Sequence, residues 1–179
     1  MTEHSLLENE KAHLAGLLEA IERCVYFLNA SSSSLEWPLQ GSYLATHKKD
    51  LDLFEALAAI NERFAKLQDT LGAAMRHSLI LSGEQADSFI KVLAIFEKSG
   101  VVLSIESWQV ARAARNLAAH DYETDYDLVA QHFNSLREQE NMLYQTAGRF
   151  LRFAKDTLKV PPLSSDFSQE FLQITQACA

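Results

Sequence analysis

Apolar residues recur every three or four positions along most of the chain, and this spacing predicts amphipathic α-helices. The first such stretch covers residues 5–29, and a second begins near residue 43. In the second stretch the apolar positions alternate in steps of four and three: Leu53, Leu57, Ile60, Phe64, Leu67 and Leu71. Because fewer than ~4 heptads are sustained, the alternation favours a helix of a bundle over a coiled coil.

Polar residues and glycine suggest the ends of the next helix. Ser82, with Gln85 three residues later, resembles a capping box, in which each side chain bonds a backbone N–H of the first turn. Phe89 opens a short apolar face, and Gly100 suits the left-handed position that closes a helix. The pattern therefore predicts a third helix from about residue 82 to residue 99.

Two more helices are expected in the second half of the chain. Ser104 or Ser107 can cap the first of them, which would hold Trp108 on its inner face and end near residue 119. Asp125 and Asp127 suit the positive end of the second helix dipole. The core stripe of this last long helix would be Val129, Phe133, Leu136, Leu143, Ala147, Phe150 and Ala154.

Breaks in the pattern divide the chain into three parts. A serine run at residues 30–34 predicts a flexible linker, so residues 1–42 would form an N-terminal helix and loop packed on the bundle. Residues 43–160 would form the helical core, and a tail, residues 161–179, follows the Pro161-Pro162 stop. The expected fold is all-α, an up-and-down bundle of four to five helices.

Composition narrows the classes of function. With 6 Gly and 3 Pro in 179 residues, the chain has too few turn residues for an all-β fold. A formal net charge of −8 argues against nonspecific binding to nucleic acid through a basic surface. Neither a disulfide framework nor a metal-ligand spacing is present, and no apolar run approaches the ~20 residues of a membrane span. We expect a cytoplasmic protein without a cofactor, a metal or a membrane segment.

One segment reverses the charge of this acidic chain. Residues 107–120 contain two arginines and one histidine but no acidic residue. Arg112, Arg115 and Asn116 fall within little more than one helical turn, and His120 follows Arg115 by five residues. On a continuous helix His120 would point about 140° away from Arg115. The two would meet if the helix loosens near residue 119, or if a second copy in a dimer completes the site.

An arginine and a histidine together can cut RNA without a metal. The guanidinium of Arg115 matches phosphoryl oxygens, and the imidazole of His120 exchanges protons near neutral pH. The ribose 2′-hydroxyl would attack the adjacent phosphorus while His120 assists proton transfer and Arg115 stabilises the developing charge. DNA lacks this nucleophile, so the expected substrate is RNA.

The string from Arg115 to Tyr122 resembles the RNxxxHxY signature of HEPN domains, particularly HepT-like toxins that pair with minimal nucleotidyltransferases. The resemblance covers roughly residues 43–158. It implies a homodimer with Arg115 and His120 in the cleft between protomers, supported by Asn116, and it makes Arg112 and Asp121 further candidates for support. It also implies that the antitoxin silences the toxin by transferring AMP to Tyr122, which places negative charge and bulk beside the site.

Other interpretations stay open. The same bundle could be a non-catalytic module that binds a nucleotidyltransferase and presents its substrate, or a scaffold in which Arg115 and His120 only bond neighbouring helices. The N-terminal and C-terminal extensions depart from compact HepT-like toxins. Four acidic residues also follow the histidine: Asp121, Glu123, Asp125 and Asp127. If they face the cleft they would repel RNA and raise the pKa of His120, whereas acids that cap the next helix would do neither.

Overall fold

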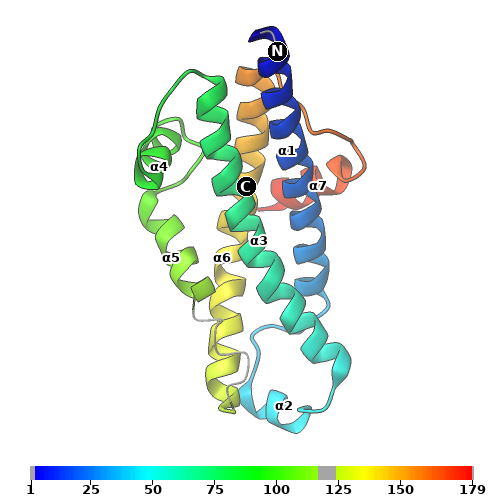
Figure 1. The fold of residues 1–179 in the computed structure, drawn as a ribbon. Helices are drawn as coiled ribbons and strands as arrows, with labels where there is room; N and C mark the ends of the chain where they lie inside the picture. The colour runs from blue at the N-terminus through cyan, green and yellow to red at the C-terminus, as the bar shows by residue number, and fades with distance from the viewer. Residues whose placement is uncertain (1–2, 117–123, 179) are drawn as a thin grey trace.

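The computed structural model describes residues 3–116 and 124–178, which form an all-helical bundle with no strand among them (Figure 1). Three long helices make up its centre: α1 (Glu3–Ser33), α3 (Leu51–Leu81) and α6 (Tyr126–Phe153). Figure 1 shows that α1 runs away from the N-terminal end of the bundle, whereas α3 and α6 run back towards it. The prediction of an all-α fold is confirmed.

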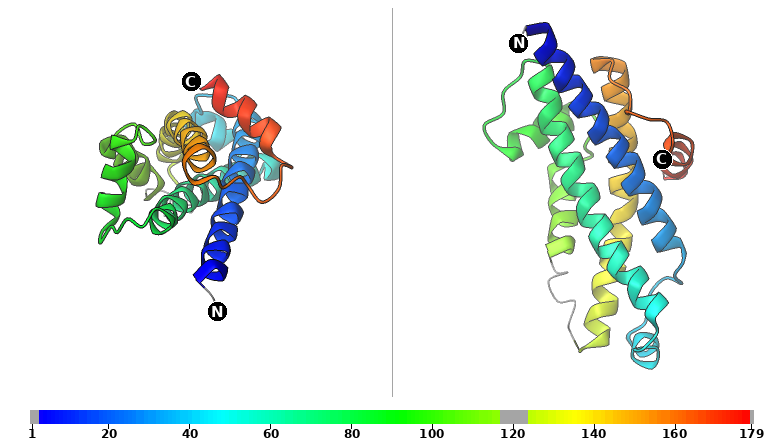
Figure 2. Two further views of the ribbon diagram at one scale, coloured as in Figure 1. Left: turned by 90° about the horizontal axis from the view of Figure 1, so that it is seen from above. Right: turned by 45° about the vertical axis from the view of Figure 1, so that its right-hand side comes forward.

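Shorter helices surround this centre. α4 (Phe89–Lys98) and α5 (Ile105–Asn116) lie on one side of α3 and α6, and α7 (Ser168–Ala177) packs on the other side against α1 and α6 (Figures 1 and 2). α2 (Gly41–Thr46) contacts α6 at the far end of the bundle. The described residues thus form seven α-helices, more than the four to five expected, because α2 and α7 were not predicted as separate helices. None of these helices is both long and apolar enough to cross a membrane.

The leucine-rich seam of α3 forms the core. All six of its predicted positions are buried: Leu53, Leu57, Ile60, Phe64, Leu67 and Leu71. α3 packs lengthwise against α1, whose own apolar stripe from Leu14 to Leu28 is buried against it. The four-three alternation therefore predicted both the helix and the way in which it packs.

The serine run is helical, so the prediction of a linker at residues 30–34 is wrong. α1 continues to Ser33, and Ser32 is fully buried. The hydroxyl of Ser32 donates to Glu140 of α6 at 2.8 Å, and its carbonyl accepts from the Trp37 indole N–H at 2.7 Å. Partners from other parts of the chain thus order a segment whose own side chains have little helical preference.

The predicted capping box at Ser82 is also wrong. α3 continues to Leu81, and Ser82 is its C-cap, with a backbone N–H that donates to the Ser78 carbonyl at 3.1 Å. Ser88 is the N-cap of α4, since its hydroxyl accepts from the Lys91 N–H. Burial of Leu79 explains the difference, because the core seam carries α3 past the point where local signals would begin a new helix.

The other helix ends follow the sequence more closely. Gly100 has a φ of 75°, as expected of a residue that closes a helix, and Ser104 accepts from the Ser107 N–H at 3.0 Å at the start of α5. Asp125 caps α6 by accepting from the N–H groups of Asp127 and Leu128. Asp125 therefore takes the capping role foreseen for these acidic residues.

The end of α6 leads into the tail. A π-helical segment, η2 (Ala154–Leu158), follows α6 and ends at Lys159, which has a left-handed φ of 59°. The chain then crosses to α1, where the Leu163 N–H donates to the Ala15 carbonyl at 3.1 Å. α7 buries Phe171 and Thr175. The sequence left the tail open between a packed and a loose segment, and its described part, residues 161–178, is thus anchored by a packed helix.

Candidate functional site

One face of α5 carries the arginines that the sequence singled out. Trp108, Arg112 and Arg115 are spaced by four and three residues, so they share one side of the helix. This side faces α3, where the Trp108 carbonyl accepts from the Gln68 amide at 3.1 Å. The spacing of the sequence therefore places both arginines at the boundary between α5 and α3.

Small residues let these helices approach closely. Gly72 of α3 lies under two aromatic rings, and a Cβ built there would be 3.1 Å from Cζ of Phe89 and 3.9 Å from Cζ2 of Trp108. The rings of Phe89 and Trp108 lie 5.9 Å apart. Ala111 and Ala114 of α5 are buried against the bundle. The absence of a side chain at Gly72 thus allows α4 and α5 to place their aromatic rings on α3.

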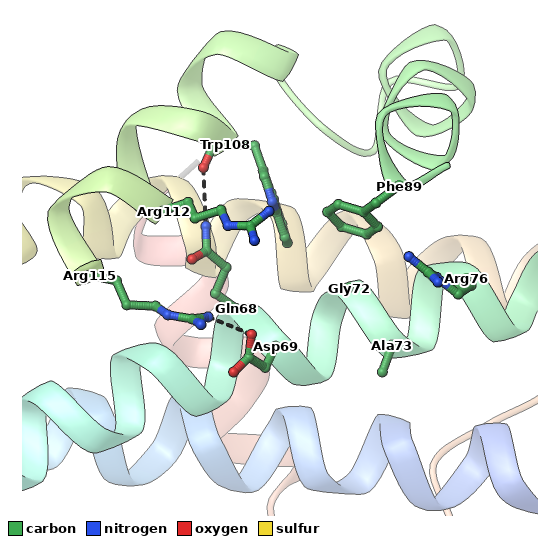
Figure 3. A pocket seen from close by; sticks show the side chains of 9 residues that line it. All are labelled: Gln68, Asp69, Gly72, Ala73, Arg76, Phe89, Trp108, Arg112 and Arg115. Atoms are coloured by element: carbon green, nitrogen blue, oxygen red, sulfur yellow. Dashed lines mark hydrogen bonds and ion pairs between the residues drawn. The ribbon is translucent and has the colours of Figure 1, made fainter. Parts of the chain in front are cut away.

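These three helices enclose a groove of about 400 Å³ (Figure 3). α3 supplies most of the lining residues, α5 supplies most of the others, and α4 contributes the ring of Phe89. The lining residues are Gln68, Asp69, Gly72, Ala73, Arg76, Phe89, Trp108, Arg112 and Arg115. We call this feature the α3–α5 groove. Its volume falls within the range of small-molecule sites in proteins.

The α3–α5 groove is positively charged, although the chain as a whole is acidic. Three guanidinium groups line it, from Arg76, Arg112 and Arg115, against the single carboxylate of Asp69. Asp69 accepts from Arg115 at 2.5 Å, and the guanidinium of Arg76 lies 5.6 Å from the centre of the Phe89 ring. Among the residues that the structure describes, no carboxylate lies within ion-pair distance of Arg112 or Arg76. The groove thus holds more positive charge than its own residues neutralise.

A buried amide completes the lining. Gln68 is 2% exposed, and its Nε2 group donates to the Trp108 carbonyl. This bond fixes the orientation of the amide, because only the NH₂ group can donate to a carbonyl. Its Oε1 atom has no hydrogen-bond partner. Figure 3 shows the amide of Gln68 between Arg112 and Arg115. A buried acceptor without a donor is unfavourable, so this oxygen is suited to a donor that arrives from outside.

The structure brings together only part of the predicted site. Arg112 and Arg115 line one groove, and Asn116 is the last residue of α5. His120, Asp121 and Tyr122 lie outside the described residues, as does the predicted helix end near residue 119. The arginine half of the predicted Arg/His pair therefore has a defined position, and the histidine half remains a prediction.

Sequence reasoning missed the contribution of α3. Asp69, Gly72, Ala73 and Arg76 follow spacings of three, one and three, which put them on one face of a helix. This face lies beside the leucine seam, which the sequence analysis did identify. The face could have been found from the same periodicity, but its pairing with α5 depends on the tertiary fold.

A second polar cluster lies between α1 and α6, away from the α3–α5 groove. The buried carboxyl of Glu140 accepts from Ser32 at 2.8 Å, from Arg137 at 2.6 Å and from the Tyr144 hydroxyl at 3.3 Å. Burial raises the pKa of Glu140, although Ser32 and then Arg137 act to lower it. Every polar neighbour of this carboxyl is a partner within the fold, so the cluster has a structural explanation.

The raised pKa of Glu140 predicts a pH-dependent stability. A carboxyl that binds its proton more tightly when folded stabilises the fold below its ordinary pKa of 4.5, and this contribution is lost as the pH rises through the raised pKa. Glu140→Gln removes the titration. Between pH 4 and pH 7, the free energy of unfolding of the wild type should therefore fall relative to that of Glu140→Gln, as measured by urea denaturation.

The control for this prediction is Glu138→Gln, which removes a carboxyl at an exposed position of the same helix. The Glu138→Gln protein should keep the fall in stability that Glu140→Gln loses. If the wild type and Glu140→Gln give parallel curves of unfolding free energy against pH, the assignment to Glu140 is wrong.

Three further observations bear on the site. Cys24 and Cys178 carry free thiols. Within residues 3–116 and 124–178, no group of three or more His, Cys, Asp or Glu side chains is arranged to hold a metal ion. Comparison of the chain with family models, with curated proteins and with solved structures finds no match. The HEPN assignment therefore stays a hypothesis that rests on the string from Arg115 to Tyr122.

Proposed function

We propose that the protein is a metal-independent endoribonuclease, the toxin of a HEPN and nucleotidyltransferase toxin–antitoxin pair that acts in the cytoplasm. One observation carries the proposal: Arg115, the first residue of the HEPN-like string, lies in the positively charged α3–α5 groove. Its side chain is 24% exposed, so an RNA phosphate can reach the guanidinium from solvent. Arg112, one turn earlier, adds a second positive charge at the same place.

The reaction needs no group beyond RNA and the side chains of the string. The ribose 2′-oxygen forms a bond to the adjacent phosphorus, and the bond from phosphorus to the 5′-oxygen of the next nucleotide breaks. The proton of the 2′-hydroxyl leaves and the departing 5′-oxygen gains one, with His120 assisting transfer. Arg115 stabilises the charge that builds on the phosphoryl oxygens, and Asn116 supports it by hydrogen bonding. The products carry a 2′,3′-cyclic phosphate and a 5′-hydroxyl.

The proposal includes that the protein acts as a homodimer. On one continuous helix Arg115 and His120 would point in different directions, so a cleft between two copies offers a way to bring them to the same phosphate. The cognate nucleotidyltransferase would end the activity by attaching AMP to Tyr122, two residues after His120. The added phosphodiester would compete with RNA for the same donors.

One contact favours a second candidate function. Arg115 already pairs with Asp69, which ties α5 to α3. In a non-catalytic module that binds a nucleotidyltransferase and presents its substrate, this pair would be the whole role of Arg115. In the ribonuclease, RNA phosphate must replace Asp69 at the guanidinium. Asp69 is 63% exposed, and ion pairs of exposed groups contribute only ~0–1 kcal/mol, so this replacement is inexpensive.

The test of the proposed function is the chemistry of the products. Purified, unmodified protein is incubated with end-labelled single-stranded RNA in EDTA, beside DNA of the same sequence and RNA carrying 2′-O-methyl groups. We expect fragments that end in 2′,3′-cyclic phosphate from the plain RNA only, because the other two lack a free 2′-hydroxyl. If folded, dimeric and unmodified protein leaves the plain RNA intact, the ribonuclease is excluded and the binding module is favoured.

A further inference from the structure

The α3–α5 groove has two chemically different ends. Figure 3 shows Arg112 and Arg115 at one end, on either side of the Gln68 amide, and Arg76 beside the Phe89 ring at the other. Asp69 and Arg76 are seven residues apart on α3, so the ends are separated by about 10 Å along the helix. An elongated small molecule can therefore contact both ends at once.

The end with two arginines is built for a multiply charged anion. Arg112 and Arg115 are one turn apart on the same face of α5, so both guanidinium groups can approach one anion. Asp69, the one carboxylate of the lining, is mostly exposed, so an anion can displace it from Arg115 and contact two guanidinium groups. A phosphomonoester carries between one and a half and two negative charges at neutral pH, by the usual second pKa of about 6. A carboxylate or an internal RNA phosphate carries one negative charge, so it balances the two guanidinium groups of Arg112 and Arg115 less well.

The unpartnered oxygen of Gln68 adds a requirement for a donor. This atom lies at the end where Arg112 and Arg115 would hold the phosphate, and an anionic oxygen cannot bond to it. A hydroxyl close to the phosphate can donate to it once the long arginine side chains adjust around the ligand. Sugar phosphates have such a hydroxyl beside the phosphate.

The opposite end suits a flat group. The guanidinium of Arg76 lies over the Phe89 ring, and the Trp108 ring packs on the other side of Phe89. Planar rings stack favourably on guanidinium and aromatic groups. Ala73, which is exposed, leaves the α3 side of the groove between the ends without a long side chain. The two ends and the stretch between them together match a phosphate, a hydroxylated linker and a planar ring, in that order.

We propose that the α3–α5 groove binds a small phosphomonoester that carries a hydroxyl and a planar ring, with its phosphate at Arg112 and Arg115 and its ring at Arg76 and Phe89. This site goes beyond the proposed ribonuclease, since binding requires neither His120 nor the cutting of a bond. The ligand is either a free sugar phosphate with a ring or the 5′-phosphorylated end of an RNA strand, and the two sources share this chemistry.

Isothermal titration calorimetry on the full-length His120→Ala protein tests the site. The His120→Ala change keeps the RNA probes intact, so the outcome does not depend on cleavage. Four probes are compared: uridine 5′-monophosphate, uridine, UpU, whose one phosphate is a diester, and pUpU, which has a 5′-monoester. We expect the two monoesters to bind at least about tenfold more tightly than uridine and UpU.

Variants locate the ligand in the groove. Arg112→Gln, at the phosphate end, and Arg76→Gln, at the ring end, should each weaken binding of the better monoester by about tenfold or more. Both side chains are exposed, and far-UV circular dichroism checks that each variant is folded. The matched control is Arg152→Gln, an exposed arginine near the end of α6 that does not line the groove and should leave binding unchanged.

Each outcome decides the proposal. Tighter binding of uridine 5′-monophosphate than of pUpU assigns a free metabolite, and the reverse assigns an RNA end; either supports the site. Binding of UpU as tight as that of the monoesters overturns it, because the groove would then select any phosphate. Equal loss of binding in Arg112→Gln and Arg152→Gln also overturns it. If the monoesters bind but RNA is never cut by the wild type, the ribonuclease fails and the groove ligand stands.

Discussion

Replacing Arg115 by alanine is expected to lower the rate of RNA cleavage by about 100- to 1,000-fold, the usual loss when one donor to a developing oxyanion is removed. The same change should lower the free energy of unfolding by less than about 1 kcal/mol, because the partner Asp69 is mostly exposed and can be solvated alone. Single-turnover cleavage and urea denaturation measure the two effects. A large kinetic loss with a small stability loss is typical of a residue that contacts the substrate.

Arg152→Ala is the matched control for Arg115→Ala. It removes an exposed arginine from α6, outside the groove, and should leave the cleavage rate within about twofold because it leaves the groove charges in place. A scaffold predicts the opposite pattern for Arg115→Ala, with a loss of stability and no specific kinetic effect. If the Arg115→Ala protein cleaves RNA as fast as Arg152→Ala does, Arg115 has no catalytic role.

Replacing Trp108 by alanine is expected to destabilise the fold by about 3–5 kcal/mol, as is usual when a large buried aromatic side chain is truncated. Trp108 is 2% exposed and packs on Phe89 and over Gly72. Its loss would leave a cavity at the point where α3, α4 and α5 meet. Urea denaturation monitored by far-UV circular dichroism measures the change without relying on tryptophan fluorescence.

Val110→Ala provides the comparison for Trp108→Ala on the same helix. Val110 is exposed, so its truncation should change the free energy of unfolding by less than about 0.5 kcal/mol. Should Trp108→Ala cost no more than Val110→Ala, the ring would not hold α5 against α3, and the shape of the groove would have to depend on other contacts.

Periodicity predicted most of the fold because burial is periodic. The seam from Leu53 to Leu71 is where the spacing placed it. The expected core stripe of α6 is buried too, except that Val129 is only half-buried and Ala154 belongs to η2. Errors arose where long-range partners outweigh local signals. Ser32 is helical because Glu140 accepts from its hydroxyl, and Ser82 ends a helix because the seam of α3 reaches as far as Leu79. Neither partner can be identified from nearby residues.

The site was predicted only as far as one helix could show it. Arg112 and Arg115 were found because they interrupt the acidic character of the chain. The sequence did not reveal Asp69, Gln68 and Arg76 as site residues. A polar face of a helix becomes part of a site only when another helix packs against it. The carboxylate that pairs with Arg115 comes from 46 residues earlier in the chain. Such pairings are a property of the folded chain.

The two faces of α3 have different roles: one face holds the bundle together, and the other lines the groove. The seam from Leu53 to Leu71 is buried in the bundle, whereas Asp69, Ala73 and Arg76 point outward into the groove. Substitutions at these three positions can alter ligand preference while the buried seam is left intact. A library restricted to them would therefore sample new specificities in proteins that nearly all still fold, which makes this helix a practical starting point for redesign.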